Sequence, residues 1–288
     1  MTGAPRGRPP RRGGPNRRPE RSGGRPPRRE AGPDKGLGGE QVEGRQAVAE
    51  LLLARRRRVR EVWLAEDLDP AELIDEIVDR AERLRVPVRR VSRARLEAAA
   101  RTEAPQGVLA HAEPLPEAEF EALCRPSQGL PLLLAVDGVT DPQNLGALLR
   151  TAEAAGATGA VLPRHRAVHV TPAVTKAAAG AVERLPIALV TGLPTALTRA
   201  KELGIWVVGL VTDSGQSLFD LSIGDAPVMA VLGAEGSGLS RLVAARCDVL
   251  ATIPLRGAIP SLNVGAAGAV ALFELARQRS QGAADAGS

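Results

Sequence analysis

From residue 132 onward, short apolar runs alternate with amphipathic segments of helical length. Leu132 to Val136 is a continuous apolar run, which is typical of a strand buried in a parallel sheet. Further strands are predicted at residues 159–162, 187–190, 205–211, 228–232 and 249–253, with helices at 144–155, 172–182, 194–203, 239–246 and 261–277. Because strand and helix alternate throughout, the pattern predicts an open, mostly parallel α/β sheet with helices on both faces.

The last predicted helix, 261–277, is apolar on almost every face. A helix of this kind is normally buried on more than one side. Two polar side chains, Ser261 and Asn263, stand at its beginning. The free N–H groups of a first helical turn can form a small-ligand site, but spacing alone favours a simpler arrangement, in which Ser261 caps the helix and Asn263 closes a turn.

Residues 39–112 show the same alternation in a shorter form and are predicted to be a small α/β domain. Its helices are expected at 41–58, 70–85 and 94–101, and its strands at 59–65, 86–91 and 107–111. Residues 113–131 contain four prolines and are predicted to be a linker with a turn or two of helix. The larger domain then spans residues 132–279, and 280–288 form a flexible C-terminus.

Residues 1–38 differ from the rest of the chain in composition. They hold 9 Gly, 8 Pro and 11 Arg or Lys, against only three acidic residues. Such a segment cannot bury enough apolar surface to offset its chain entropy, so it is predicted to be disordered. The whole chain carries a net charge of +5, so the excess of positive charge lies in this tail. The tail is either a flexible RNA contact or a solubilising extension without a specific partner.

Arginines also gather in the small domain. Arg45, Arg55, Arg56 and their neighbours lie on or just after its first predicted helix, where they form either a phosphate-binding face for RNA or a solvated helix end. Aromatic residues make up only 2% of the chain, so a nucleic-acid surface here cannot depend on aromatic stacking.

The remaining composition bears on location and on metals. No apolar run is long enough for a membrane helix, and Cys124 and Cys247 fit no metal or redox motif. We therefore expect a cytoplasmic protein without disulfides. His165 and His169 are four residues apart, but no carboxylate or cysteine stands near them, so we interpret this segment as a surface loop and predict no metal site.

A glycine-rich loop, Gly233 to Gly238, follows the apolar strand 228–232 and precedes a helix. It lacks the G-x-G-x-x-G pattern of dinucleotide-binding loops and the Lys-Ser/Thr pair of a P-loop. Glu235 at its centre would repel a phosphate and would favour an uncharged or cationic ligand. The loop alone is weak evidence, because glycine-rich turns between strand and helix are common.

Three stretches taken together are more specific. They are DPQNLG at 141–146 with Arg150, GAEGSGLS at 233–240, and Ile253-Pro254 followed by SLNV at 261–264. In this order and spacing they resemble the three motifs of the SpoU (TrmH) family, RNA ribose 2′-O-methyltransferases within the SPOUT group. The resemblance covers roughly residues 40–279, because the small domain is similar to the substrate-binding domain of RlmB-type members. Ala234, Ala178 and Gly265 depart from the commonest residues of the pattern, but none is assigned to chemistry.

The resemblance implies a fold with a C-terminal trefoil knot and a homodimer packed partly through the last helix. It implies S-adenosylmethionine as cofactor, bound near Leu232, Gly233, Gly236, Ile253 and Leu262. It also implies catalytic residues. Arg150 would hold the phosphate beside the target ribose or stabilise the developing alkoxide, since an arginine is a poor proton acceptor. Asn144 would orient Arg150 or the ribose, Glu235 would hold the guanidinium, and Ser261 and Asn263 would line the methyl-transfer pocket.

The extra N-terminal domain favours large-subunit (23S) ribosomal RNA, with a guanosine as the target. A transfer RNA methyltransferase and a catalytically silent RNA-binding protein of ribosome assembly remain alternatives. A nucleotide-binding oxidoreductase is disfavoured by the missing fingerprint and by Glu235 at the phosphate position. We expect neither a membrane nor DNA as a partner.

Overall fold

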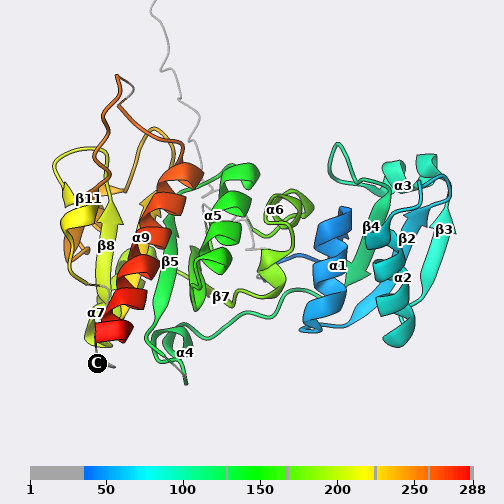
Figure 1. Ribbon diagram of the computed structural model, residues 1–288, viewed down its shortest axis with the longest axis horizontal. Coiled ribbons are helices and arrows are strands. Elements are labelled where there is room, and N and C mark those ends of the chain that lie inside the picture. The colour runs from blue at the N-terminus through cyan, green and yellow to red at the C-terminus, as the bar shows by residue number, and fades with distance from the viewer. Residues whose placement is uncertain (1–35, 128, 166–168, 224–225, 259, 286–288) are drawn as a thin grey trace, which may run out of the picture. The chain divides into compact units, whose positions relative to one another are not determined.

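The computed structural model describes residues 36–127, 129–165, 169–223, 226–258 and 260–285, with side chains up to residue 280 (Figure 1). The predicted disordered tail lies outside the described residues up to residue 35. Among the residues described, no helix is both long and apolar enough to cross a bilayer.

The larger domain is built on a seven-stranded sheet within the described residues, and every pairing in it is parallel. The strand order is β7-β6-β5-β10-β8-β11-β9. The strands are β5 (Leu132–Asp137), β6 (Gly159–Pro163), β7 (Ile187–Val190), β8 (Trp206–Leu210), β9 (Gln216–Ser217), β10 (Val228–Gly233) and β11 (Val249–Thr252). The predicted parallel α/β sheet is confirmed.

Helices cover both faces of this sheet because the central strands are apolar on both sides. Leu134 of β5 and Ala230 of β10 share one core cluster with α5 and α9. Leu133 and Met229, one residue earlier, share another with α7. The helices are α4 (Phe120–Cys124), α5 (Pro142–Ala154), α6 (Pro172–Ala177), α7 (Leu193–Glu202), α8 (Arg241–Ala244) and α9 (Val264–Asp285), with 3-10 turns η1 (Ala181–Glu183) and η2 (Leu218–Asp220).

Two helix predictions need correction. The helix predicted at 172–182 divides into α6 and η1, because Ala179 and Gly180 adopt φ values of 48° and 84°, which a right-handed helix does not allow. The last helix begins at Val264 and not at Ser261. Its first turn is satisfied by Asn263, whose Oδ1 accepts the Gly265 N–H at 2.8 Å, so Asn263 takes the capping role expected of Ser261.

The small domain is a four-stranded mixed sheet with order β1-β4-β2-β3, in which only β2 and β3 pair in parallel. Its elements are β1 (Gln41–Glu43), α1 (Arg45–Ala54), β2 (Val59–Ala65), α2 (Glu72–Arg83), β3 (Val88–Val91), α3 (Arg93–Ala99) and β4 (Val108–Ala112). The helix predicted at 41–58 is therefore wrong at both ends. Gly44, with φ 96°, separates β1 from α1, and Arg55 leaves the helix in the left-handed region.

The segment predicted to be a linker is packed against the larger domain. Leu115 is buried in the core of that domain, and the Ala118 N–H donates to the Ile187 carbonyl of β7. The expected turn of helix is present as α4, whose Leu123 is buried. Leu37, which the sequence placed in the tail, is also buried in this core.

The chain passes from β11 to α9 through residues 253–263. The predicted trefoil knot concerns this segment, in which residue 259 lies outside the described residues. The knot stays a prediction.

Candidate active site

The three motif stretches meet at the carboxyl ends of β5 and β10, which are neighbours in the sheet. Asn263, just before α9, donates from Nδ2 to Asn144 Oδ1 at 2.9 Å. Asn144 in turn donates from Nδ2 to Glu235 Oε2 at 3.0 Å. A continuous chain of hydrogen bonds thus joins three segments that are far apart in the sequence. We call Asn263, Asn144 and Glu235 the polar relay.

Asn144 is held in place by the start of α5. Asp141 caps this helix, and its carboxylate accepts the N–H groups of Gln143 and Asn144 at 3.3 and 3.1 Å. Pro142 occupies the first turn, where its missing N–H is not needed. Because an asparagine side chain both donates and accepts, a fixed Asn144 can connect a donor on one side with a carboxylate on the other.

The loop that carries Glu235 is folded tightly on itself. A Cβ on Gly233 would lie 2.1 Å from the Gly238 carbonyl carbon, so no larger residue fits there. The Gly238 N–H donates to the Ala234 carbonyl at 2.8 Å, which closes the turn. Beyond it, Asp137 at the end of β5 accepts the Ser240 N–H at 2.7 Å. The close turn presents Glu235 at its exposed tip.

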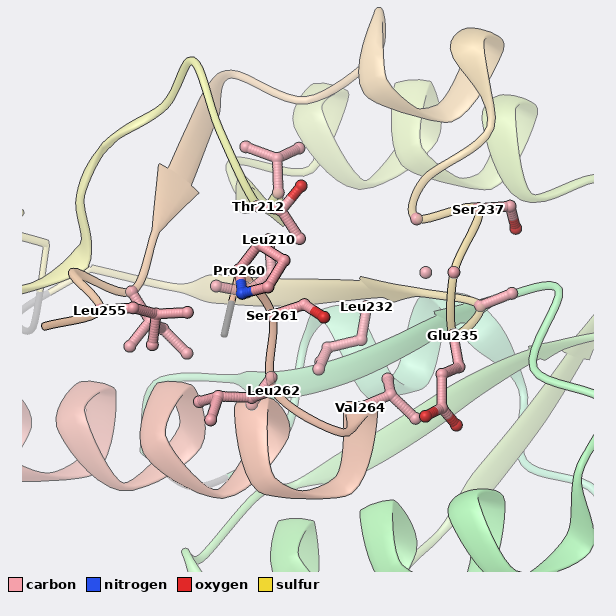
Figure 2. Close-up of a pocket in the computed structure, with 17 residues that line it drawn as sticks. Leu210, Thr212, Leu232, Glu235, Ser237, Leu255, Pro260, Ser261, Leu262 and Val264 are labelled. Carbon is pink, nitrogen blue, oxygen red and sulfur yellow. The ribbon is translucent and has the colours of Figure 1, made fainter. Parts of the chain in front are cut away.

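A cavity of about 360 Å³ lies beside the relay (Figure 2). Its walls are mostly apolar side chains and the backbone of the glycine-rich loop, and Glu235 is the only ionisable side chain among its lining residues. Cavities of this size and character suit small ligands. The lining includes all five residues predicted to bind the cofactor, together with Ser261: Leu232, Gly233, Gly236, Ile253 and Leu262.

One side of the cavity, at the end of β8, was not predicted from the sequence. Leu210, Val211 and Thr212, at the end of β8, also line it. The available signal was the predicted strand at 205–211, since ligands on parallel sheets lie at the carboxyl ends of strands. The strand order, which puts β8 beside β10, could not be read from the sequence.

Arg150 is placed differently from the expectation. It is exposed on α5, and it has no hydrogen bond or ion pair with any residue that the structure describes. Asn144 lies in the first turn of the same helix, six residues before Arg150. Because six residues are not a whole number of helical turns, the two side chains lie on different faces of α5. Glu235 accordingly holds Asn144 and not the guanidinium.

The three arginines of the predicted RNA face do not line the cavity. Arg45 donates from Nε to the Gln106 carbonyl at 3.3 Å, and Arg55 is exposed. The guanidinium of Arg56 donates to the carbonyls of Glu183 and Leu185 in the larger domain. Burial lowers the pKa of Arg56, and the nearby Glu183 partly opposes this shift.

Another basic surface was not singled out from the sequence. Arg89, Arg90, Arg93 and Arg95 are exposed on β3 and α3, and the Arg95 guanidinium carbon lies 5.1 Å from the centroid of the Trp63 ring. The signal was present, since residues 85–101 hold six arginines and one acidic residue. We call Arg89, Arg90, Arg93 and Arg95 the β3–α3 arginines.

The histidines and cysteines play no visible part in this site. Within the described residues, no group of three or more His, Cys, Asp or Glu could hold a metal ion. His165 is exposed, and residues 166–168 beside it lie outside the description. Burial raises the pKa of both free thiols, Cys124 and Cys247, to about 11.

Comparisons with known proteins agree with the two-domain arrangement. Residues 131–273 match the SpoU rRNA Methylase family, and residues 41–118 match the domain described as RNA 2′-O ribose methyltransferase substrate binding. The chain is 41% identical over 244 residues to the 23S rRNA (guanosine-2′-O-)-methyltransferase RlmB of Pseudomonas aeruginosa, covering 83% of this chain and 97% of the relative. It is 34% identical to a putative TrmH family tRNA/rRNA methyltransferase of Staphylococcus haemolyticus, covering 83% and 96%.

Solved structures share the fold over both domains. The AdoMet-bound rRNA methyltransferase of Sinorhizobium meliloti is 25% identical, with a TM-score of 0.67 over 82% of this chain and 86% of that one. AviRb of Streptomyces viridochromogenes, a SpoU methyltransferase, is 23% identical, with a TM-score of 0.69 over 84% and 90%. By its sequence matches to both domains and its identity with curated relatives over nearly their whole length, the chain belongs to the SpoU rRNA methylase family.

Proposed function

We propose that this protein transfers a methyl group from S-adenosylmethionine to a ribose 2′-hydroxyl in RNA, at a guanosine of 23S ribosomal RNA. The polar relay beside an apolar cavity carries this proposal, because it joins all three family motifs at one place. The choice of RNA and nucleotide is supported by the similarity to the 23S rRNA (guanosine-2′-O-)-methyltransferase RlmB of Pseudomonas aeruginosa.

The cavity fits the cofactor by its chemistry. Leu232, Ile253 and Leu262 offer apolar contact to the adenine and to the methylene groups of the methionine part of the cofactor. The backbone of the loop 233–238 offers donors and acceptors for the edge of the adenine. None of the described residues that line the cavity is a lysine or arginine, so none of them repels a sulfonium cation. When bound, S-adenosylmethionine supplies an electrophilic methyl group.

Charge stabilisation and the shape of the cavity are assigned to residues of the chain. Arg150 is exposed and unpaired among the described residues, so it is available to an RNA phosphate or to the alkoxide that develops as the 2′-hydroxyl loses its proton. Because a guanidinium stays protonated in proteins, it can stabilise negative charge but does not accept the proton. Asn144, Glu235 and Asn263 keep the loop around the cavity in a single geometry, and Ser261 adds a hydroxyl to the cavity wall.

RNA would be held by the small domain, whose match is to a substrate-binding domain. Of the exposed β3–α3 arginines, Arg90 and Arg95 supply positive charge for phosphate contacts there, and Arg89 and Arg93 would first have to leave their ion pairs with Glu61 and Asp67. We further propose a homodimer that uses α9, because Phe273 on this helix keeps 52% of its surface exposed. The cytoplasm is the proposed location, and free thiols are consistent with its reducing conditions.

Mapping ribose methylation across total RNA tests the function. Cells that lack this protein should lose 2′-O-methylation at one guanosine of 23S RNA, and the wild-type gene should restore it. A gene with Arg150→Ala should not restore it, although the variant should accumulate normally because the side chain is exposed. Loss of a transfer RNA methylation instead would favour the transfer RNA alternative, and an unchanged map would favour a silent RNA-binding protein.

A further inference from the structure

A buried ion pair joins the small domain to the larger one. Arg57 lies in the turn after α1, and Glu183 is the last residue of η1. Arg57 donates from Nε and Nη2 to the two carboxylate oxygens of Glu183, at 3.0 and 2.5 Å. The side chains are only 2% and 0% exposed. This two-point contact fixes the angle between the planes of both groups as well as their separation.

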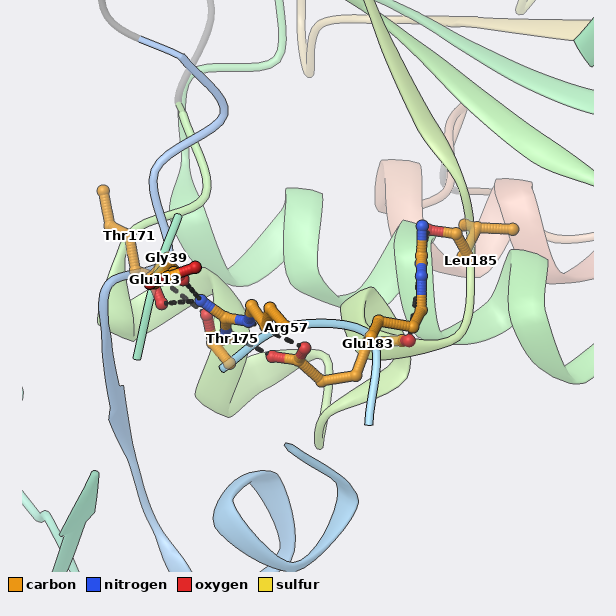
Figure 3. A network of polar contacts seen from close by, with 8 residues as sticks. Gly39, Arg57, Glu113, Thr171, Thr175, Glu183 and Leu185 are labelled. Atoms are coloured by element: carbon orange, nitrogen blue, oxygen red, sulfur yellow. Dashed lines mark hydrogen bonds and ion pairs between the residues drawn. The ribbon is translucent and has the colours of Figure 1, made fainter. Parts of the chain in front are cut away.

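The same guanidinium binds the two points at which the chain enters and leaves the small domain. Arg57 Nη1 donates to the Gly39 carbonyl at 2.6 Å, just before β1, and to the Glu113 carbonyl at 2.5 Å, just after β4 (Figure 3). One side chain therefore ties the larger domain to both connecting segments. A hinge motion that moved the small domain away from η1 would have to break both bonds between Arg57 and Glu183.

Other contacts at this junction leave little freedom. Lys176 donates from Nζ to the Ala104 carbonyl at 2.5 Å, and Arg184 pairs with Glu50 of α1 at 2.8 Å. A Cβ on Gly180 would lie 2.5 Å from the Glu50 Cβ, which shows how closely the two backbones approach. Only the Arg57–Glu183 pair among these is removed from solvent on both sides.

The junction is connected to the active site through packed elements. Both η1 and α6 pack against α5. At the α5–α6 contact, a Cβ on Gly146 would lie 2.4 Å from the Ala177 Cβ, so the two helices touch directly. Because α5 carries Asn144 and Arg150, the position of the small domain is fixed relative to the residues that would meet the target ribose.

We propose that Arg57 and Glu183 are positioning residues, which hold the substrate-binding domain at one orientation so that RNA bound by it presents its target ribose to Arg150. A buried ion pair is weak evidence for stability, since apolar replacements of both partners are often tolerated. Its directional contacts make it suited to fixing a geometry. The catalytic consequence rests on the proposed RNA methylation, whereas the domain orientation does not.

The test compares the full-length protein with Arg57→Met/Glu183→Met, which removes both charges of the buried ion pair together, along with the hydrogen bonds to the Gly39 and Glu113 carbonyls. Arg184→Met is the matched control, because it removes a more exposed ion pair at the same junction. Spin labels at Glu82→Cys and Thr195→Cys, both exposed positions, report the distance between the domains by pulsed EPR. Cys124 and Cys247 are replaced by alanine in every protein compared, so that only the two introduced thiols carry the label.

The wild type and the control should give one narrow distance distribution, and the double variant a broad one. At saturating RNA, the methylation rate of the double variant should fall on the order of tenfold or more, because misplaced reactants lose orientation. Affinities for S-adenosylmethionine and for RNA should change much less, since the cavity and the β3–α3 arginines are intact. Glu183→Gln, which keeps the shape and part of the hydrogen bonding, should recover part of the rate and guards against a misfolded double variant.

A narrow distribution in the double variant, or a wild-type methylation rate despite a broad one, would overturn the positioning role. If the wild type methylates no RNA, the proposed function fails. The EPR comparison then still decides whether Arg57 and Glu183 fix the domains.

Discussion

At the scale of single residues, the main result concerns the partners of the motif residues. The sequence places Asn144, Glu235 and Asn263 in three separate motifs, and the structure joins them through two side-chain hydrogen bonds. The sequence could not predict which of these side chains form hydrogen bonds with one another. The Asn144–Glu235 contact spans 91 positions and depends on β5 and β10 being neighbours in the sheet. The link from Glu235 to Arg150 was taken from the family resemblance, whereas in the structure the Glu235 carboxylate accepts from Asn144, which the Asp141 cap holds at the start of α5.

Replacing Glu235 tests the relay. In Glu235→Ala, Asn144 loses the acceptor of its Nδ2 group, so its amide no longer has a single orientation. We expect methyl transfer to fall roughly 10- to 100-fold, as when a preorganised polar group is lost. S-adenosylmethionine affinity, measured by calorimetry, should change far less, because the cavity walls and backbone remain.

Ser237→Ala is the control for this change. Ser237 lines the same cavity from the same exposed loop, and no hydrogen bond of its side chain joins the relay. Its activity should stay near that of the wild type. Equal losses of cofactor affinity and activity in Glu235→Ala would make Glu235 a cofactor-binding residue instead.

At the scale of helices and strands, the periodic segments were predictable and the breaks were not. Apolar runs located β5 and β10 to within one residue, because a strand buried on both faces has no polar positions to blur its pattern. The errors at 41–58 and 172–182 each contain a glycine, Gly44 or Gly180, whose positive φ interrupts the element. A glycine in a helical pattern shows only that such a break is permitted.

Gly146→Ala tests the contact between α5 and α6. Alanine has the higher helix propensity, by about 1 kcal/mol, but its Cβ would meet the Ala177 Cβ and the Val174 carbonyl oxygen at 2.4 and 2.9 Å. Overpacking of a backbone contact should prevail, and we expect a net loss of about 2 kcal/mol in the free energy of unfolding. Urea unfolding measures this loss.

Gly192→Ala provides the comparison for Gly146. It precedes α7, and its added Cβ would find its nearest neighbour, Thr195 Oγ1, at an ordinary 3.8 Å. The free energy of unfolding should change by less than about 0.5 kcal/mol. A Gly146→Ala protein as stable as this control would show that α6 moves aside easily.

The C-terminal helix α9 was expected to be apolar all round and to form the dimer. Much of its apolar surface is used within the chain, since Ala271, Leu272 and Leu275 are buried in the core of the larger domain. Ala267, another apolar residue of α9, lines the cavity and is therefore not available to a dimer interface. Phe273, 52% exposed, is therefore the residue on which the dimer proposal is best tested.

Phe273→Glu should convert a dimer to a monomer without unfolding it, because the charge replaces a solvent-facing side chain within each chain. Sedimentation velocity at micromolar concentration measures the change. Leu242→Glu on α8, where the leucine is 68% exposed, should leave the sedimentation coefficient unaltered. A wild-type protein that sediments as a monomer while methylating RNA would rule out this dimer.

At the scale of the whole molecule, the two-domain division was predictable and its limits were not. Composition distinguished the basic tail and the proline-rich stretch 113–131 from the regular domains, but the tail up to residue 35 lies outside the described residues and the stretch 113–131 packs on the larger domain. It could not show that Leu37 and Leu115, which lie at the edges of those stretches, are buried in the larger domain. Glycine and proline content indicates irregular backbone. Whether an apolar residue in such a segment is buried depends on which strands and helices pack against it in the fold.

Removal of the tail tests its contribution to RNA binding. The deletion should end at residue 35, because Leu37 is buried and its carbonyl accepts the Val170 N–H. Without its positive charges, RNA affinity should fall, and the slope of log affinity against log salt should become shallower by about 0.7 to 0.9 per lost phosphate contact. The methylated nucleotide should stay the same. A shift of the modified position would instead give the tail a role in target choice.

Asn263 completes the relay, and its other members, at positions 144 and 235, precede it in the chain. Synthesis proceeds from the N-terminus, so β5, α5 and the loop of Glu235 emerge from the ribosome before the segment that closes the cavity. The nascent chain can therefore fold its small domain and most of its sheet, but it cannot yet hold the complete site. The cavity is therefore complete only after residues 260–264 have packed against the loop of Glu235, and removal of residue 260 onward should abolish cofactor binding because it takes away Ser261, Leu262 and Val264 from the cavity wall.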